Sequence, residues 1–257
     1  MNHTALITGA SSGIGLELAK IFAQNNIHLV LVARNKTKMD ELSEELHRTY
    51  NINCTVIASD LSLPGSAGEI YKACMSKNIH VNYLINNAGF GDYGFFHDSN
   101  VHKQLNMIQL NITTLTELTR LFLPPMIEKK FGKILNVAST AAFIPGPKMS
   151  VYFATKAYVL SFSEAIHEEL KGTGVSVTAL CPGPTESDFF NKASMNEAGM
   201  VKGKKMPGSK EVAEFGYKKL MADEAVAIHG FMNYITANIV RFTPRNIVRI
   251  IVKKIIG

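Results

Sequence analysis

The sequence predicts one α/β domain built on a doubly wound parallel sheet of about seven strands, with helices on both faces. Short apolar runs alternate with longer segments of helical periodicity along the 257 residues, the pattern typical of β-α-β units. One run, HLVLVA at His28–Ala33, is almost continuously apolar, as expected of a strand that is covered on both faces. A glycine cluster follows the first run and marks a tight strand-to-helix turn.

Seven apolar runs are the predicted strands. They cover Ala5–Thr8, His28–Ala33, Cys54–Ala58, Val81–Asn86, Gly132–Ala138, Val175–Leu180 and Ala225–His229. The predicted helices carry apolar residues at helical spacing. They cover Gly13–Asn25, Thr37–Thr49, Pro64–Lys77, Val101–Lys130, Ser150–Lys171, Ser209–Met221 and the remainder of the chain, which Pro244 interrupts. Pro124 and Pro125 predict a kink or break in the long fourth helix, because proline has no backbone N–H.

The composition is that of an ordinary globular protein, with 46% hydrophobic and 19% charged residues. No domain boundary is visible, so residues 1–257 are expected to form one domain. It would include an irregular substrate loop at about 184–207, with a short helix near Asp188–Lys192. The net charge of +6 is not accompanied by a nucleic-acid-binding motif. Three cysteines without CxxC spacing and the lack of a signal-peptide pattern favour the cytoplasm.

The first strand runs into the turn TGASSGIG, Thr8–Gly15. Gly9 permits the tight turn, Gly13 lets the backbone approach a ligand, and Gly15 lets the helix pack closely against the strand. The N–H groups and the dipole at the helix N-terminus favour a phosphate. The alternative is a glycine-rich turn without a ligand, but a strand before it and a helix after it are the context that a phosphate site requires.

The spacing TGxxxGxG differs from the common GxGxxG, and it resembles that of the short-chain dehydrogenase/reductase family. Further motifs recur in the order of that family. They are Asn86-Asn87-Ala88-Gly89, Asn111, Ser139, Tyr152-Phe153-Ala154-Thr155-Lys156 and Pro182-Gly183. The resemblance covers nearly the whole chain. It implies a Rossmann-type fold and an oxidoreductase that transfers a hydride between a nicotinamide and a carbonyl or secondary alcohol. The alternative is a catalytically silent NADP-binding sensor or scaffold with the same fold.

The second predicted strand ends in Ala33 and Arg34. NAD enzymes of this fold usually have an acidic residue here, whereas an arginine can bind a 2′-phosphate, so we expect NADP(H). Asp60 and Leu61 resemble the adenine-contacting pair of the family, and the alternative is that Asp60 caps the following turn. The family often has a threonine where this chain has Ser187, and Thr185 is a second candidate for the nicotinamide carboxamide. The predicted cofactor-binding residues are Gly9, Ser11, Ser12, Gly13, Ile14, Gly15, Arg34, Asp60, Leu61, Asn87, Ala88, Gly89, Tyr152, Lys156, Pro182, Gly183 and Thr185.

Tyr152 and Lys156 are four residues apart on a predicted helix and so share one face. An ammonium group, together with an oxidised nicotinamide, would lower the pKa of the phenol toward neutrality and suit it to general acid/base catalysis. By resemblance, Ser139 orients the substrate carbonyl, and Asn111 distorts its helix and holds a water in a proton relay to Lys156. We therefore predict Asn111, Ser139, Tyr152 and Lys156 as catalytic, and Ser139 and Tyr152 as substrate-binding.

The histidines have no metal-ligand spacing and no GxSxG elbow is present, so neither a metal site nor a hydrolase is expected. Apolar side chains at Phe90–Phe96, Ala141–Met149 and in the loop Pro184–Pro207 favour a hydrophobic substrate. Alternatively, many of these side chains simply pack the loops. The aromatic and long apolar candidates are Phe90, Tyr93, Phe95, Phe96, Phe143, Ile144, Phe189, Phe190 and Met195.

The tail at about 239–257 has a basic residue every four positions, at Arg241, Arg245, Arg249 and Lys253. If it is helical, these residues form one stripe, which we interpret as a solvated face in preference to a contact with anionic lipid or an acidic partner. By resemblance, the helices predicted at 101–130 and 150–171 pair subunits, so a homodimer or homotetramer is expected.

Overall fold

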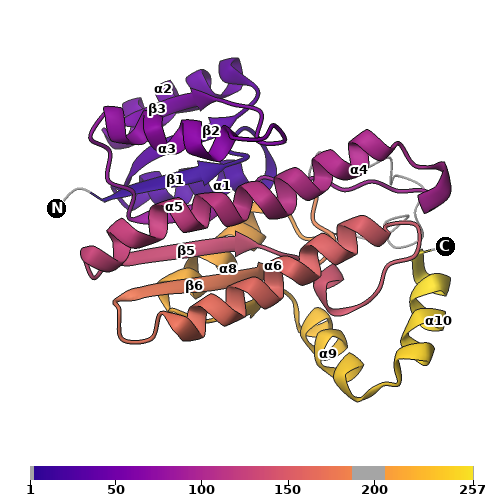
Figure 1. Ribbon diagram of the computed structural model, residues 1–257. Helices are drawn as coiled ribbons and strands as arrows, with labels where there is room; N and C mark the ends of the chain where they lie inside the picture. Colours follow the sequence, from indigo (N-terminus) through magenta and orange to yellow (C-terminus); the bar gives the residue numbers. More distant parts are fainter. Residues whose placement is uncertain (1–2, 187–205, 257) are drawn as a thin grey trace.

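The computed structural model describes residues 3–186 and 206–256, and its centre is one seven-stranded sheet (Figure 1). All strands are parallel, in the order β3-β2-β1-β4-β5-β6-β7. They are β1 Thr4–Thr8, β2 His28–Ala33, β3 Cys54–Ala58, β4 Tyr83–Asn86, β5 Gly132–Val137, β6 Val175–Cys181 and β7 Val226–Ile228. The strand order reverses between β1 and β4, which is the point where a doubly wound sheet opens a crevice. The predicted fold class is confirmed.

Helices cover both faces of the sheet. They are α1 Gly13–Gln24, α2 Lys36–Tyr50, α3 Ser66–Ser76, α4 Val101–Ile108, α5 Leu115–Glu128, α6 Ser150–Glu169, α8 Ser209–Met221, α9 Phe231–Ile239 and α10 Arg245–Ile256. Buried residues of α1, α2 and α8, such as Phe22, form one core with the sheet. Buried residues of α3, α5 and α6, such as Phe122, form a second core on the other face. Figure 1 shows α5 and α6 crossing in front of the sheet and α8 behind it.

The long helix predicted at Val101–Lys130 is interrupted, but not at its prolines. It consists of α4, a π-helical segment at Gln109–Thr114 and α5. Helix α5 continues through Pro124 and Pro125, so a break at these residues is wrong, and a kink stays a prediction. Each proline removes one backbone hydrogen bond near the end of the helix, and the burial of Phe122 in the core holds the helix against the sheet.

Helix α3 begins two residues later than the predicted start at Pro64. Gly65 precedes it with φ +82°, a left-handed conformation that a helix cannot continue. The short helix predicted near Asp188–Lys192 lies outside the described residues, as does most of the predicted substrate loop.

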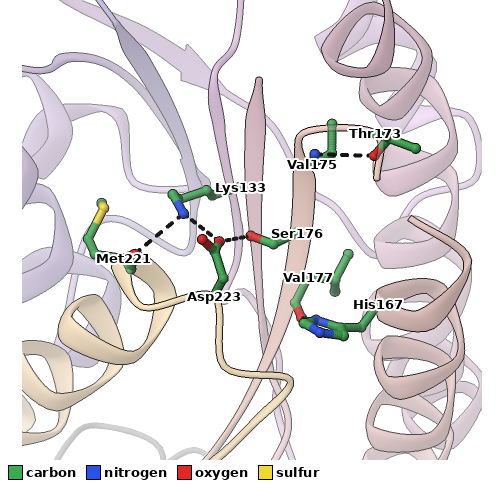
Figure 2. Close-up of polar contacts among 8 residues, drawn as sticks. All are labelled: Lys133, His167, Thr173, Val175, Ser176, Val177, Met221 and Asp223. Atoms are coloured by element: carbon green, nitrogen blue, oxygen red, sulfur yellow. Dashed lines mark hydrogen bonds and ion pairs between the residues drawn. The ribbon is translucent and has the colours of Figure 1, made fainter. Parts of the chain in front are cut away.

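The amino ends of β5 and β6 are tied to the loop after α8 by a charged cluster (Figure 2). Lys133 of β5 and Ser176 of β6 both donate hydrogen bonds to the carboxylate of Asp223, and Lys133 Nζ lies 3.5 Å from the carbonyl oxygen of Met221. Partial burial would raise the pKa of Asp223, but the hydrogen bonds from Lys133 and Ser176 outweigh it and lower that pKa. The cluster lies at the end of the sheet opposite the glycine turn, so it serves stability.

At the same end of the sheet, two contacts fix α6 and the turn that enters β6. His167 Nδ1 lies 2.8 Å from the carbonyl oxygen of Val177, so this nitrogen carries the proton and donates it. Thr173 Oγ1 accepts a hydrogen bond from the backbone N–H of Val175 over 3.2 Å, which fixes the turn that enters β6. The contact with Val177 gives His167 the structural role that scattered histidines more often have.

We expect Asp223→Asn to lower the free energy of unfolding by about 1 kcal/mol at neutral pH, because Lys133 loses its ionic partner. The side chain of Asp223 is half exposed, so solvent screens the pair and limits the loss. Asparagine also tolerates the positive φ of this position. Because the folded-state pKa of Asp223 is lowered, its stabilisation is present above the ordinary carboxyl pKa and is lost as pH falls through the lowered value. Urea unfolding of wild type and variant should therefore give a difference that shrinks in acid; a constant difference would contradict the ionic account.

Candidate active site

The turn after β1 is a compact cradle of backbone. Gly9 and Gly13 have φ of +68° and +59°, a region that residues with a Cβ rarely adopt. The Gly9 N–H donates to the carbonyl oxygen of Val32 over 2.8 Å. A Cβ placed on Gly15 would lie 2.4 Å from the carbonyl oxygen of Gly9, so only glycine allows α1 to approach so closely. The backbone N–H groups at the start of α1 are thereby available to an anion such as a pyrophosphate.

A hydrogen-bonded clamp joins the carboxyl ends of β1 and β4 beside this turn. Thr8 Oγ1 donates to the carbonyl oxygen of Ile85 over 3.2 Å and accepts from the N–H groups of Asn87 and Ala88 over 3.0 Å each. Asn87 Nδ2 donates to the carbonyl oxygen of Thr8 over 2.9 Å. Asn87 thus fixes the ends of β1 and β4, which border the crevice at the point where the strand order reverses.

The neighbouring Asn86 is buried in a polar network on the other side of β4. Its Nδ2 donates to Thr119 Oγ1 over 3.1 Å and to Asn136 Oδ1 over 2.9 Å. Asn136 Nδ2 in turn donates to Ser163 Oγ over 2.9 Å. The network ties β4 and β5 to α5 and α6, so Asn86 supports the sheet rather than the crevice.

Ser139, Tyr152 and Lys156 come together at the end of β5. Ser139 Oγ accepts a hydrogen bond from the Ala141 N–H over 3.1 Å and also hydrogen-bonds the side chain of Tyr152. Lys156 Nζ donates to the carbonyl oxygen of Val137 over 2.6 Å and lies 5.8 Å from the centroid of the Tyr152 ring. The i, i+4 spacing on α6 therefore places phenol and ammonium on one face, next to the serine.

Burial shifts both titratable groups of this trio toward their neutral forms. Burial raises the pKa of Tyr152 to about 12, although the hydrogen bond from Ser139 opposes this shift. Burial lowers the pKa of Lys156 to about 8. The sequence predicts a phenol pKa that Lys156 and an oxidised nicotinamide together lower toward neutrality. The residues of the chain by themselves do the opposite, so Tyr152 keeps its proton at neutral pH.

Asn111 lies in the π-helical segment and is almost fully buried. Its Oδ1 accepts from the Phe90 N–H over 3.2 Å, and its Nδ2 donates to the carbonyl oxygen of Phe90 and to Thr155 Oγ1, each over 3.0 Å. The helix distortion expected at Asn111 is present. The side chain contacts the residue next to Lys156, whereas its role in a proton relay remains a prediction.

Arg34 and Asp60 lie at the carboxyl ends of β2 and β3. Arg34 is 71% exposed, and its Nη1 is 4.0 Å from Asp60 Oδ2. Asp60 Oδ1 accepts from the N–H and the hydroxyl of Ser62 over 3.0 and 2.7 Å. Partial burial raises the pKa of Asp60, but the Ser62 hydrogen bonds and the charge of Arg34 outweigh it and lower that pKa. Asp60 therefore caps a turn, which was the alternative interpretation, and still faces the crevice.

One cavity of about 1010 Å³ runs from the glycine turn to Tyr152. Most of the predicted site residues line it. They are Gly9, Ser11, Ser12, Gly13, Ile14, Arg34, Asp60, Leu61, Asn87, Ala88, Gly89, Ser139, Tyr152, Lys156, Pro182, Gly183 and Thr185. Gly15 and Asn111 do not line the cavity. Gly15 packs against Gly9, and Asn111 hydrogen-bonds Phe90, both of which line it. Thr185 is buried and donates to the carbonyl oxygen of Gly183 over 2.9 Å, whereas Ser187 lies outside the described residues.

The cavity also has walls that the sequence did not predict. Asn233 and Ala237 of α9 and Ile255 of α10 line it. A Cβ on Gly183 would lie 2.5 Å from Asn233 Nδ2, which shows how closely α9 approaches this segment. No local motif marks these residues, because the chain returns to the cavity only through the packing of its last helices.

Of the apolar candidates, Phe90, Phe143 and Ile144 line the cavity. Phe95 and Phe96 are 57% and 68% exposed and do not line it, so the expected pocket contact of these two is wrong in the described part of the chain. Their segment leads into the start of α4. Three candidates fall outside the described residues. They are Phe189, Phe190 and Met195.

The described residues also bear on other classes of site. Within them, no three His, Cys, Asp or Glu side chains are grouped so that they could hold a metal ion. None of the helices in the same residues is long and apolar enough to span a membrane.

Comparison with known proteins agrees with this geometry. The model of the family described as short chain dehydrogenase matches residues 3–198. A very-long-chain 3-oxoacyl-CoA reductase of Rattus norvegicus is 34% identical over 189 residues, which are 71% of this chain and 59% of that enzyme. The chain thus matches less than two thirds of the length of this relative.

Solved structures match over more of their length. A short-chain dehydrogenase of Sphingobium yanoikuyae in complex with NADPH is 30% identical, with a TM-score of 0.84 over 93% of this chain and 94% of that one. A bulky-bulky ketone specific alcohol dehydrogenase of Comamonas testosteroni is also 30% identical, with a TM-score of 0.80 over 93% and 92%. The chain therefore belongs to the short-chain dehydrogenase family, whose members are oxidoreductases with a nicotinamide cofactor.

Proposed function

We propose that the protein is an NADPH-dependent oxidoreductase that interconverts a carbonyl and a secondary alcohol on a hydrophobic substrate, with Tyr152 as general acid/base. The observation that carries the proposal is the meeting of Ser139, Tyr152 and Lys156 on the wall of the same cavity as the glycine turn. A nucleotide bound along the turn would reach these three groups within one cavity. The outcome in which NADPH binds but no carbonyl is turned over would favour the silent sensor or scaffold instead.

The residues of the chain fit a dinucleotide. The positive φ of Gly9 and Gly13 and the close approach at Gly15 leave room for a pyrophosphate on the N–H groups of α1. Asp60 would contact the adenosine half, and Lys156 the ribose of the nicotinamide half. When bound, the nicotinamide supplies or accepts the hydride.

In reduction, Tyr152 donates its proton to the carbonyl oxygen as the hydride reaches the carbonyl carbon. A phenol whose pKa is about 12 is fully protonated at neutral pH, which suits this direction. Ser139 would hydrogen-bond the same oxygen and stabilise the charge that develops on it. Asn111 would act at a distance, because Thr155 links it to the turn of α6 that carries Lys156.

The choice of NADP over NAD rests on Arg34. Its exposed guanidinium borders the cavity at the carboxyl end of β2, where Ala33 stands in place of an acidic residue. An arginine can bind a 2′-phosphate with two hydrogen bonds, whereas a carboxylate would repel it. The NADPH complex of the Sphingobium yanoikuyae relative supports this choice.

Arg34→Ala is expected to weaken NADPH binding by about 10- to 100-fold and to leave NADH binding unchanged, because only NADPH carries the phosphate. Titration of both nucleotides by fluorescence measures the ratio of the two affinities. Lys36→Ala is the matched control, because Lys36 is an exposed cation two residues away that does not line the cavity. If Arg34→Ala leaves the ratio as it is in the wild type, the account of the 2′-phosphate is wrong.

The substrate class follows from the apolar lining of the cavity, to which Phe90 and Phe143 contribute. Ile144, Met149 and Phe153 also line it and pack in one apolar cluster with Tyr152. Two relatives act, by their names, on very-long-chain 3-oxoacyl-CoA and on bulky ketones. We therefore propose a ketone with long or bulky apolar substituents. A panel that runs from acetone to long-chain 3-oxoacyl thioesters, assayed by loss of NADPH absorbance, should show kcat/KM rising with apolar size.

We further propose that the enzyme is a homodimer or homotetramer in the cytoplasm. The exposed apolar residues Leu105 and Ile108 lie on α4, within one of the helices expected to pair subunits. The thiols of Cys54, Cys74 and Cys181 are unpaired, and burial raises the pKa of each to about 11 or 12. Such thiols remain protonated and fit a reducing compartment.

A further inference from the structure

The last two helices form an arm that stands away from the sheet. Helix α9, the 3-10 turn Val240–Phe242 and α10 make up this C-terminal hairpin, which is drawn in yellow at the lower right of Figure 1. Val248, Val252 and Ile256 bury one face of α10 against the loops around the cavity. The remaining faces of the hairpin are largely exposed.

The exposed faces are unusually apolar. On α9 and the turn, Phe231, Ile235, Ile239 and Phe242 recur at i, i+4, i+8 and i+11 and so share one face; Phe231 and Phe242 are 76% and 86% exposed. Helix α10 exposes four isoleucines, Ile247, Ile250, Ile251 and Ile255. At 100° per residue, Ile247 and Ile250 lie opposite the buried face, and the other two lie beside it. Ten of the large hydrophobic residues that the described chain exposes belong to residues 231–255, which is a concentration typical of a docking surface.

The charge of the same segment has one sign only. From Ala225 to the last residue the sequence contains no Asp or Glu. Five basic residues lie in the hairpin, and all but Lys254 border the hollow between the hairpin and the start of α6. They are Arg241, Arg245, Arg249, Lys253 and Lys254. An amphipathic helix pair with cations and exposed apolar side chains matches the surface of an anionic bilayer, where the cations meet phosphates and the apolar face enters the acyl boundary.

Two other occupants fit less well. The first is water alone, which is the solvated face that the sequence favours for the basic stripe. Water would then contact both apolar faces of the hairpin, so this interpretation does not account for the exposed phenylalanines and isoleucines. A second hairpin from another copy would bring five positive charges against five, without an acidic residue in either segment. We therefore propose that the C-terminal hairpin docks the protein on the surface of an anionic phospholipid membrane.

Docking would also affect access to the cavity, because residues of the hairpin line it. Asn233, Ala237 and Ile255 of the hairpin line the cavity that holds Tyr152. A second hollow of about 1060 Å³ lies between the hairpin and the start of α6, and Phe143 and Phe153 border both hollows. Docking would place lipid beside the apolar side of the cavity, where a hydrophobic substrate enters. This consequence rests on the proposed function, whereas the docking itself does not.

The test is flotation of the full chain with vesicles of phosphatidylcholine, with and without phosphatidylglycerol. The wild type should float with the anionic vesicles and remain in solution with phosphatidylcholine alone. The double variant R245Q/R249Q should lose about fivefold in partition per residue, or about 25-fold together. The control is K171Q/K210Q, which removes the same charge from exposed lysines outside the hairpin and should bind like the wild type.

A second pair of variants tests the apolar faces. Ile250→Ser should weaken flotation, whereas Ile127→Ser, at an exposed isoleucine of α5, should not. NADPH affinity shows that each variant is folded and is not expected to change. Equal binding to both vesicle types, equal binding of R245Q/R249Q and K171Q/K210Q, or no flotation of the wild type would overturn the proposal. So would a change of oligomeric state in Ile250→Ser without a change in flotation, because the hairpin would then contact a second copy.

Discussion

Tyr152→Phe is expected to lower kcat for ketone reduction by about 10²- to 10⁴-fold and to leave NADPH affinity unchanged. The substitution removes one hydroxyl and keeps the ring, which lies 5.8 Å from Lys156 Nζ and packs with the buried residues around Met149. That hydroxyl bonds Ser139, and its pKa of about 12 keeps the proton in place until transfer. Phenylalanine has no proton to donate, so the carbonyl oxygen would have to take one from water. Turnover is measured by NADPH absorbance and affinity by fluorescence titration.

Tyr158→Phe is the matched control on the same helix. Its hydroxyl lies 3.0 Å from Thr116 Oγ1 at the surface, so its loss should leave turnover unchanged. Equal turnover in the two variants would exclude Tyr152 as the proton donor. Loss of both turnover and NADPH binding in Tyr152→Phe would point to a disturbed cavity, and the reduced affinity would distinguish that result from the proposed one.

The sequence predicts the fold well because the signals that determine it are local. Periodicity and turn residues identify each strand, and the topology follows from strands that alternate with helices. The errors occur where tertiary packing decides. Pro124 and Pro125 disfavour a helix locally, but the burial of Phe122 keeps α5 intact. The actual interruption is the π-helical segment around Asn111, which only the resemblance to the family predicted.

The candidate site is predictable to a similar extent and for a similar reason. Its motifs follow strands, and a parallel sheet gathers the carboxyl ends of its strands at one edge. The contribution of α9 and α10, such as Asn233, depends on a long-range return of the chain that no motif marks. The direction of the Tyr152 pKa depends on burial, which spacing alone does not reveal. The tail shows the same limit, because its charges are visible in the sequence and the exposure of Phe242 and Ile250 is not.

Gly15→Ala is the second variant with a large expected effect. The added Cβ would lie 2.4 Å from the carbonyl oxygen of Gly9 and 2.5 Å from Asn87 Nδ2. The first of these atoms is backbone in a residue at φ +68°, so it has little freedom to move. We expect the free energy of unfolding to fall by about 1–3 kcal/mol. Because α1 must shift away from the turn, NADPH affinity should fall by at least about tenfold, which corresponds to a loss of ~1.4 kcal/mol in binding.

Gly68→Ala provides the matched control, because Gly68 is the third residue of α3 as Gly15 is of α1. A Cβ on Gly68 meets no atom within 4 Å, so alanine should raise the free energy of unfolding by about 0.5–1 kcal/mol through its higher helix propensity. Urea unfolding and NADPH titration of both variants separate the two effects. If Gly15→Ala behaves like Gly68→Ala, the close approach of α1 to the turn does not form the nucleotide cradle. The expected result is that Gly15→Ala lowers both the free energy of unfolding and the NADPH affinity. Gly68→Ala should raise the free energy of unfolding and leave the NADPH affinity unchanged. This difference would show that Gly15, unlike Gly68, shapes the nucleotide site.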